Sequence, residues 1–264
     1  MFSYRLQLTI LVILVQTGFS AAKLRAASDL KCYATLDNNV LAIGNTRIRR
    51  EFEWNKGDLK TILLLDKTKD AGLVIRNRRG DTWLGKTAGK VRSGQWTKKV
   101  VENALVNSHL QVEVTTGYEH LDVRRVFRIY PDCAIIGCDY YLRAHQGDSV
   151  KFEPRDTVLQ MLRLPGAHWR YRAVEFFDRT DRINNLVRET SALAYVAGAE
   201  LRGNILFGKS ALGDTAIVMI KEAPCSFTQL HYPGYDFNVS TRGVQAVGLG
   251  VSPGGLPGGK WVRV

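Results

Sequence analysis

The sequence predicts an all-β fold of antiparallel strands with few short helices. In the segment 46–54, apolar Ile48, Phe52 and Trp54 alternate with charged residues, as a half-buried antiparallel strand requires. A second region, 110–143, holds several strand-like runs separated by short turn sequences. Strands and helices do not alternate regularly along the chain, which excludes a parallel α/β barrel or a nucleotide-binding sheet. The regular strand spacing favours a β-sandwich.

Polar turns separate the expected strands. The predicted strands are 40–43, 46–54, 59–65, 110–116, 121–130 and 134–143, with further strands in 204–220 and 224–230. Arg50 interrupts the apolar side of its strand, so we expect its side chain to reach solvent at a sheet edge. The segment Asp181–Thr190 is compatible with a short helix or an irregular loop.

Residues 1–22 predict a secretory signal peptide. A short start carrying Arg5 precedes an apolar run from Leu6 to Phe19, and the small residues 20–22 suit a cleavage point. The apolar run is short for a membrane span, which needs about 20 residues. We therefore expect a secreted or periplasmic protein that does not interact with a membrane.

Export would place the cysteines in a compartment that permits disulfides. The four cysteines are Cys32, Cys133, Cys138 and Cys225. Three pairings of four cysteines exist, and all remain open at this point. The five histidines are scattered and no paired CxxC spacing occurs, so we expect no metal site. The absence of a GxGxxG or P-loop motif likewise predicts no cofactor.

The formal net charge is +12, which raises the question of nucleic-acid binding. The arginines are spread along expected strands: Arg47, Arg49, Arg50, Arg76, Arg78, Arg79, Arg124, Arg125 and Arg128. They form no basic block within a helix-turn-helix or zinc-finger pattern. We interpret them as a solvated basic β-surface and expect no nucleic-acid partner.

The segment 222–237 is crowded with aromatic and polar side chains around a Pro233-Gly234 reversal. We expect the turn to direct Tyr232, Tyr235 and Asp236 outward together. Aromatic faces beside a carboxylate suit sugar rings, although the pattern also fits an ordinary aromatic corner of a β-domain. The candidate carbohydrate contacts are His231, Tyr232, Tyr235, Asp236 and Trp83. No nucleophile motif such as GxSxG occurs, so no catalytic residue is predicted.

The segment 253–264 is rich in glycine and proline and ends in a strand-like run, 260–264. We interpret it as a junction toward a following domain and expect an uncovered apolar patch around Trp261. The alternative is a tail that ends as a docked edge strand.

Five segments together carry a family resemblance. They are 43–50, 54–59, 176–187, 201–204 and 221–225 continued by 232–236. In combination they resemble the amino-terminal domain of secreted bacterial α-galactosidases of the melibiase type, glycoside hydrolase family 36 and its relatives. The resemblance covers nearly all of residues 35–264.

The resemblance implies that residues 23–252 form a large antiparallel β-supersandwich, which in that family precedes a (β/α)8 barrel. The barrel carries the two catalytic aspartates of a retaining mechanism and needs roughly 250 residues of its own. Neither aspartate has a matching position here, so the chain alone is expected to be inactive. The implied partners are an α-galactoside or related carbohydrate, such a barrel and a second copy of the chain. Two alternatives stay open: a free-standing carbohydrate-binding module and a basic adhesion or polyanion-binding protein.

Overall fold

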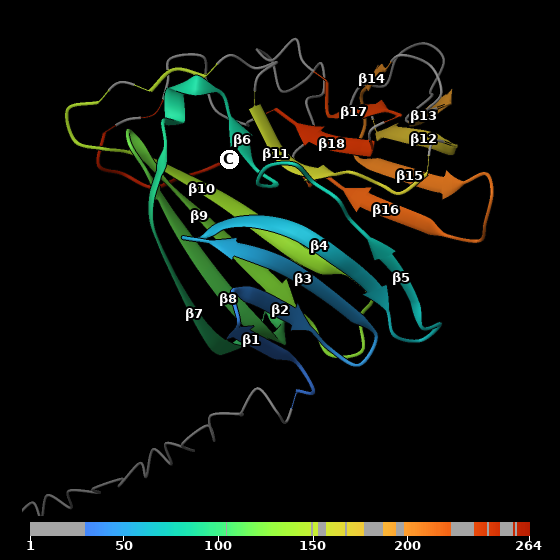
Figure 1. Ribbon diagram of the computed structural model, residues 1–264, viewed down its shortest axis with the longest axis horizontal. Coiled ribbons are helices and arrows are strands. Elements are labelled where there is room, and N and C mark those ends of the chain that lie inside the picture. The colour runs from blue at the N-terminus through green and yellow to red at the C-terminus, as the bar shows by residue number, and fades with distance from the viewer. Residues whose placement is uncertain are drawn as a thin grey trace, which may run out of the picture.

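The computed structural model confirms the predicted all-β fold with antiparallel strands (Figure 1). It describes residues 30–103, 105–148, 150–152, 157–166, 168–176, 187–193, 198–222, 235–241, 243–248, 256 and 258–264. Within these ranges the helical content is one 3-10 turn, η1 (Lys86–Ala88), and no helix is long and apolar enough to cross a membrane. The signal peptide and the expected strand 224–230 lie outside the described residues.

Two five-stranded sheets pack face to face as the first sandwich. One sheet runs in chain order through β1 (Tyr33–Asp37), β2 (Val40–Gly44), β3 (Ile48–Asn55), β4 (Asp58–Asp66) and β5 (Ala71–Val74). The other has the order β19 (Val262–Arg263), β10 (Ile136–Ala144), β9 (Leu121–Ile129), β8 (Val106–Tyr118) and β7 (Val91–Asn103). Inward-facing residues of both sheets form one core, in which the rings of Phe52 and Phe127 lie 5.4 Å apart.

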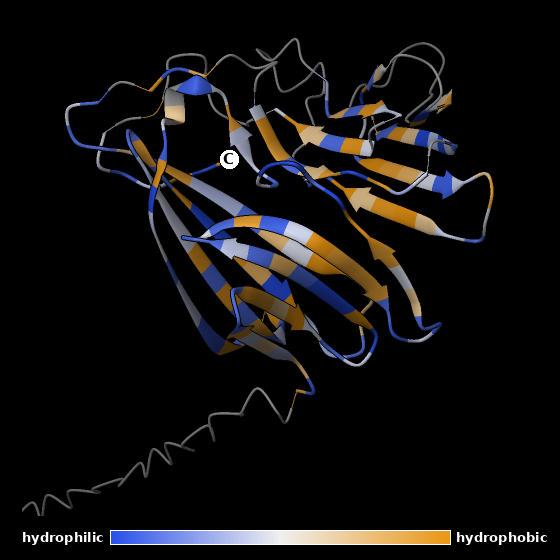
Figure 2. Ribbon diagram, viewed as in Figure 1, coloured by the Kyte–Doolittle hydropathy of each residue, from blue (hydrophilic) through white to orange (hydrophobic). Residues whose placement is uncertain are grey.

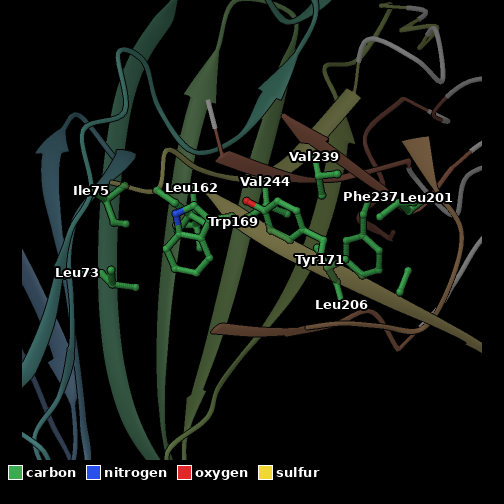
Figure 3. Packing of buried hydrophobic residues seen from close by; sticks show 12 residues of the cluster. Leu73, Ile75, Leu162, Trp169, Tyr171, Leu201, Leu206, Phe237, Val239 and Val244 are labelled. Atoms are coloured by element: carbon green, nitrogen blue, oxygen red, sulfur yellow. The ribbon is translucent and has the colours of Figure 1, made fainter. Parts of the chain in front are cut away.

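The second sandwich combines a five-stranded and a four-stranded sheet. The first of these has the order β14 (Ala199–Leu201), β17 (Phe237–Ser240), β18 (Gly243–Val247), β11 (Thr157–Leu162) and β6 (Trp83–Leu84). The other, which we call the outer sheet, has the order β13 (Val187–Leu193), β12 (Trp169–Phe176), β15 (Ile205–Ser210) and β16 (Ala216–Ile220). Figure 3 shows their shared core, where Tyr171 stacks on Trp169 and Phe237 lies beside Leu206.

A third cluster of buried residues joins the two sandwiches. Tyr140 and Leu142 from β10 of the first sandwich pack with Leu84 and Leu159, which belong to β6 and β11 of the second. Leu73 and Ile75 extend from the first sandwich into the core of the second (Figure 3). Because these apolar contacts are continuous across the junction, the two sandwiches share a buried interface.

The turn of the β3–β4 hairpin explains which residues stand at its centre in the family-like segment 54–59. Lys56 and Gly57 both have positive φ, 49° and 82°, which suits a tight turn whose twist matches the flanking strands. The turn also lies directly on β7, because a Cβ added to Gly94 would come within 2.0 Å of the carbonyl oxygen of Lys56. Glycine at position 94 therefore permits this contact between the two sheets of the first sandwich.

Two of the arginines that we expected at the solvated surface are buried, so that prediction is wrong for them. Arg50 donates to Thr61 and Asp81 instead of reaching a sheet edge. Arg125 lies among the inward-facing residues of β9 and donates to the carbonyl of Gly57 and to the Thr116 hydroxyl. Charged side chains become buried where the interior provides hydrogen-bonding partners, and one partner of each arginine is distant in sequence, Asp81 by 31 residues and Gly57 by 68.

Residues 181–186 of the segment that we expected as a short helix or a loop lie outside the described residues. Residues 187–190, which we placed in a helix or loop, belong to strand β13.

The three described cysteines are free thiols, and Cys225 lies outside the described residues. Burial raises the pKa of the Cys32 thiol, and it raises the pKa of Cys138 to about 12. Both thiols are therefore protonated at neutral pH and are poor nucleophiles.

Candidate functional surfaces

The structure brings three of the predicted carbohydrate contacts to one end of the β14–β17–β18–β11–β6 sheet. Trp83 pairs with Val158, Val158 pairs with Val247, and the Val247 amide donates to the Asp236 carbonyl. Trp83 and Asp236 thus share one cross-strand row, three strand spacings or roughly 14 Å apart. Tyr235 is next to Asp236 in the chain, whereas the remaining two candidates, His231 and Tyr232, lie outside the described residues.

Asp236 does not point outward, so that expectation is wrong. Its side chain is 1% exposed and accepts hydrogen bonds from the Gly203 amide and from Lys221 Nζ, both at 2.9 Å. Lys221 Nζ also donates to the Val247 carbonyl at 2.8 Å. The pair ties the end of β16 to β17 and β18, which is a structural role.

Trp83 and Tyr235 are half-buried, and each has a guanidinium near its ring. The Cζ atom of Arg79 lies 4.2 Å from the Trp83 ring centroid, and that of Arg202 lies 5.7 Å from the Tyr235 centroid. Burial lowers the pKa of Arg79. Such cation–π contacts cover part of a ring, so less of each aromatic face is left for a sugar.

A second aromatic surface lies on the outward side of β9, β10 and β19. We call its residues the arginine–aromatic face: Arg124, Tyr141, Arg143, Trp261 and Arg263. The Cζ atoms of Arg124 and Arg143 each lie 4.5 Å from the Trp261 ring centroid, and Arg124 is 4.6 Å from that of Tyr141. Cross-strand pairing of Arg124 with Tyr141, and of Tyr141 with Arg263, holds these side chains in one row.

Carboxylates balance the charge of the arginine–aromatic face. Arg143 pairs with Asp122 at 2.5 Å, and Arg263 pairs with Asp139 at 2.7 Å. The hydrogen bond that Arg263 donates to Asp139 raises the pKa of Arg263. Because each guanidinium has an acidic neighbour, this surface suits a neutral ligand rich in hydroxyls better than an anion.

Strand β19 shows how the described end of the segment 253–264 is held, and the junction toward a following domain stays a prediction. Val262 and Arg263 pair with β10, and Leu256 is buried in the cluster that joins the sandwiches. The described part of the segment is thus a docked edge strand. Trp261 is half-buried with two guanidiniums near its ring, and no exposed large hydrophobic residue is described beside it, so the prediction of an uncovered apolar patch around it is wrong.

Exposed apolar residues gather instead on the outward side of the outer sheet. We call them the apolar face: Phe176, Val187, Phe207, Val218 and Ile220. Cross-strand pairing joins Phe176 to Val187 and Phe207 to Val218. Figure 2 shows β16 as hydrophobic along most of its length. The expected alternation would have placed polar residues here, so sequence reasoning missed this surface.

A buried polar cluster centred on Asp81 connects the two sandwiches. Its carboxylate accepts hydrogen bonds from Arg50 at 3.0 Å, from the Thr61 amide at 2.8 Å, from Asn77 at 2.7 Å and from Gln160 at 2.9 Å. These partners come from β3, β4, the loop after β5 and β11. Every acceptor position of the carboxylate serves the protein itself, which marks the cluster as structural.

No grouping of three or more His, Cys, Asp or Glu in the described ranges could hold a metal ion.

Asp58 is a further carboxylate with a shifted pKa. Burial raises the pKa of Asp58, although the nearby Arg125 opposes this shift. The Tyr118 hydroxyl lies 3.5 Å from Asp58, and burial raises its pKa as well. These groups lie under the β3–β4 hairpin in the first sandwich and not on either of the surfaces described above.

No protein family matches this chain, and no curated protein is significantly similar to it.

Proposed function

We propose that the chain is the non-catalytic amino-terminal β-supersandwich domain of an α-galactosidase-like glycoside hydrolase that is secreted or periplasmic. In this role it packs on a (β/α)8 catalytic barrel and supports carbohydrate binding or oligomerisation. The proposal rests on the five family-like segments and on the all-β fold. The observation that carries the docking role is the apolar face.

Two of the family-like segments, 43–50 and 54–59, lie where the two sheets of the first sandwich meet. Asn45, within the segment 43–50, is buried and donates to the carbonyls of Tyr130 and Cys133 at 2.6 and 2.7 Å. Its Oδ1 atom accepts from the amides of Arg47 and Ile48. The segment 54–59 forms the hairpin that packs on β7. These residues therefore have a structural role in the first sandwich.

The apolar face supports docking of a further domain. Contiguous exposed apolar surface is uncommon on soluble monomers and often marks an interaction site. Here two phenylalanines and three β-branched residues lie on neighbouring strands with substantial exposure. Aromatic residues near the centre of an interface commonly provide most of its binding free energy, which makes Phe207 the residue to test.

We expect Phe207→Glu to weaken binding to a melibiase-type barrel, produced without its own amino-terminal domain, by at least about tenfold. The physical reason is that a carboxylate would be buried against apolar surface without a partner. Calorimetric titration of the barrel with the chain lacking residues 1–22 measures the effect. Ile135→Glu, at another exposed apolar position, is the control and should leave the affinity unchanged. Equal affinities for both variants would contradict docking through this face.

The arginine–aromatic face favours one alternative, a free-standing carbohydrate-binding module. The guanidinium and carboxylate groups around Trp261 and Tyr141 offer hydrogen bonds to a sugar, although the guanidiniums cover part of each ring, as at Trp83 and Tyr235. If this alternative holds, the chain alone should be retained on immobilised galactosides. Retention should be lost in Trp261→Ala and kept in Trp96→Ala, in which the substituted indole packs against the first core. Absence of retention at all would exclude this role for galactosides.

A further inference from the structure

We propose that β16 is a pairing edge through which two copies of the chain associate, with the two β16 strands antiparallel across a two-fold axis. The inference specifies the oligomerisation included in the proposed function. It rests on backbone geometry and side-chain exposure, and it requires neither a barrel nor a galactoside.

The hydrogen bonds that flank β16 reveal which of its backbone groups face the free edge. The Ser210 amide donates to the Thr215 carbonyl at 2.9 Å, and the Lys221 amide donates to the Asn204 carbonyl at 2.8 Å. Hydrogen-bonded pairs alternate along an antiparallel ladder, so odd-numbered residues from 215 to 221 bond to β15. The amide and carbonyl groups of Ala216, Val218 and Ile220 therefore point away from β15, and no described strand pairs with them.

The same three residues have exposed side chains, whereas Ile217 and Met219 between them pack toward the core. Unpaired backbone groups and exposed apolar side chains thus coincide along one edge. An extended strand of another chain would pair with these backbone groups and place its own side chains beside the exposed apolar row, as in recognition by strand addition.

β16 also lacks the charges that protect other sheet edges in this protein. Edge strand β7 carries Lys98 and Lys99, β13 carries Arg188 and Glu189, and β19 carries Arg263. Charged residues on edge strands commonly prevent unwanted pairing. Edge strands β1 and β14 carry Asp37 and Glu200, and the uncharged edge strands β5 and β6 have only four and two residues. Among the described strands, β16 is therefore the longest edge strand without a charge.

A second copy is the occupant that matches this edge best. With Val218 opposite its own symmetry mate, Ala216 faces Ile220, and three residue pairs each exchange two backbone hydrogen bonds. No charge lies within the paired strands, and the outward row reads Phe207, Val218, Val218, Phe207 across the axis. Asp214 would face Glu222 beyond the strand ends, where Glu222 already lies 3.3 Å from Arg128.

Edge pairing and barrel docking use different surfaces of the outer sheet. Strand pairing takes place in the plane of the sheet through backbone groups, whereas the apolar face presents side chains perpendicular to that plane. The net charge of +12 makes two copies repel at a distance, so added salt should strengthen their association. Association with a partner of opposite charge would instead be weakened by added salt.

Cross-linking of Val218→Cys tests the two-fold geometry. Opposed residues of a hydrogen-bonded pair have Cα atoms about 5.5 Å apart, which a disulfide can span. Val74→Cys is the matched control, because Val74 is 55% exposed on another edge strand and Val218 is 54% exposed. On mild oxidation of the chain lacking residues 1–22, we expect a disulfide-linked dimer from Val218→Cys. Val74→Cys should remain at the level of the unsubstituted chain.

Sedimentation equilibrium provides a second measurement that does not depend on sulfur chemistry. Val218→Lys should raise the dimer dissociation constant by at least about tenfold, because two like charges would face each other across the axis. Circular dichroism should show that the exposed substitution leaves the fold intact. Cross-linking no greater than that of Val74→Cys, or a monomeric unsubstituted chain at all concentrations, would overturn the proposal. Either result leaves the effect of Phe207→Glu on barrel binding as a separate question.

Discussion

Replacement of Asp81 by alanine should lower the free energy of unfolding by about 3–5 kcal/mol, the usual cost of breaking a buried ion pair. The Asp81 side chain is 2% exposed and forms an ion pair with the Arg50 guanidinium, with an N–O distance of 3.0 Å. Removal would leave that cation buried without a counter-charge, and the amides of Asn77 and Gln160 would also lose an acceptor. Because these donors come from both sandwiches, the variant should weaken the junction between them.

Urea denaturation followed by circular dichroism measures this change, and Arg172→Ala is the control. Arg172 forms an ion pair with Glu189 at the surface, with side chains 61% and 56% exposed, and exposed pairs contribute about 0–1 kcal/mol. Similar losses for the two variants would mean that the Asp81 cluster does not support the junction. A split of the single transition into two for Asp81→Ala would show directly that the sandwiches come apart.

Replacement of Phe237 by alanine should have a comparable effect, about 3–5 kcal/mol, because it removes a large side chain from a close-packed core. Phe237 is 0% exposed between the two sheets of the second sandwich, where it contacts the cluster that includes Tyr171 and Leu206 (Figure 3). The folded protein would lose the transfer free energy of the ring, and the residues around the resulting cavity would lose their packing contacts with it.

Phe207→Ala is the matched control for this prediction. Phe207 is 43% exposed on the opposite side of the outer sheet, and a surface substitution there should change stability by no more than about 0.5 kcal/mol. Thermal denaturation of the two variants compares the same side-chain change in the core of the second sandwich and on the outward side of its outer sheet. A large loss from Phe207→Ala would mean that the apolar face is covered within the chain, and it would remove the basis for barrel docking.

The local pattern of the sequence was enough to predict most strands of the first sandwich. Predicted strand 59–65 lies within β4, and 121–130 corresponds to β9 (Leu121–Ile129). Alternating apolar residues succeed here because each strand has one buried and one exposed side, so its period of two appears directly in the sequence. The hairpin at residues 55–58 was predictable for a similar reason, since its turn residues are specified locally.

The pattern was least informative in the second sandwich and at the candidate surfaces. Strand β13 is exposed along most of its length, so it carries no alternation, and its sequence is equally compatible with a loop. The apolar face has the opposite problem, because Val218 and Ile220 are apolar although they point outward. When both sides of a strand are apolar, the sequence does not indicate which side is buried.

The sequence by itself determined that this chain is an all-β protein, because strand periodicity is a local property. Only the tertiary structure decided which polar residues are buried. Arg50 and Asp81 are 31 residues apart, and Asp236 meets Lys221 across a span of 15 residues. A charged side chain becomes buried only where folding brings a partner to it, and the local sequence pattern does not predict such long-range contacts. The sheet edges and outward faces, on which the proposed function depends, follow from the same long-range pairing of strands.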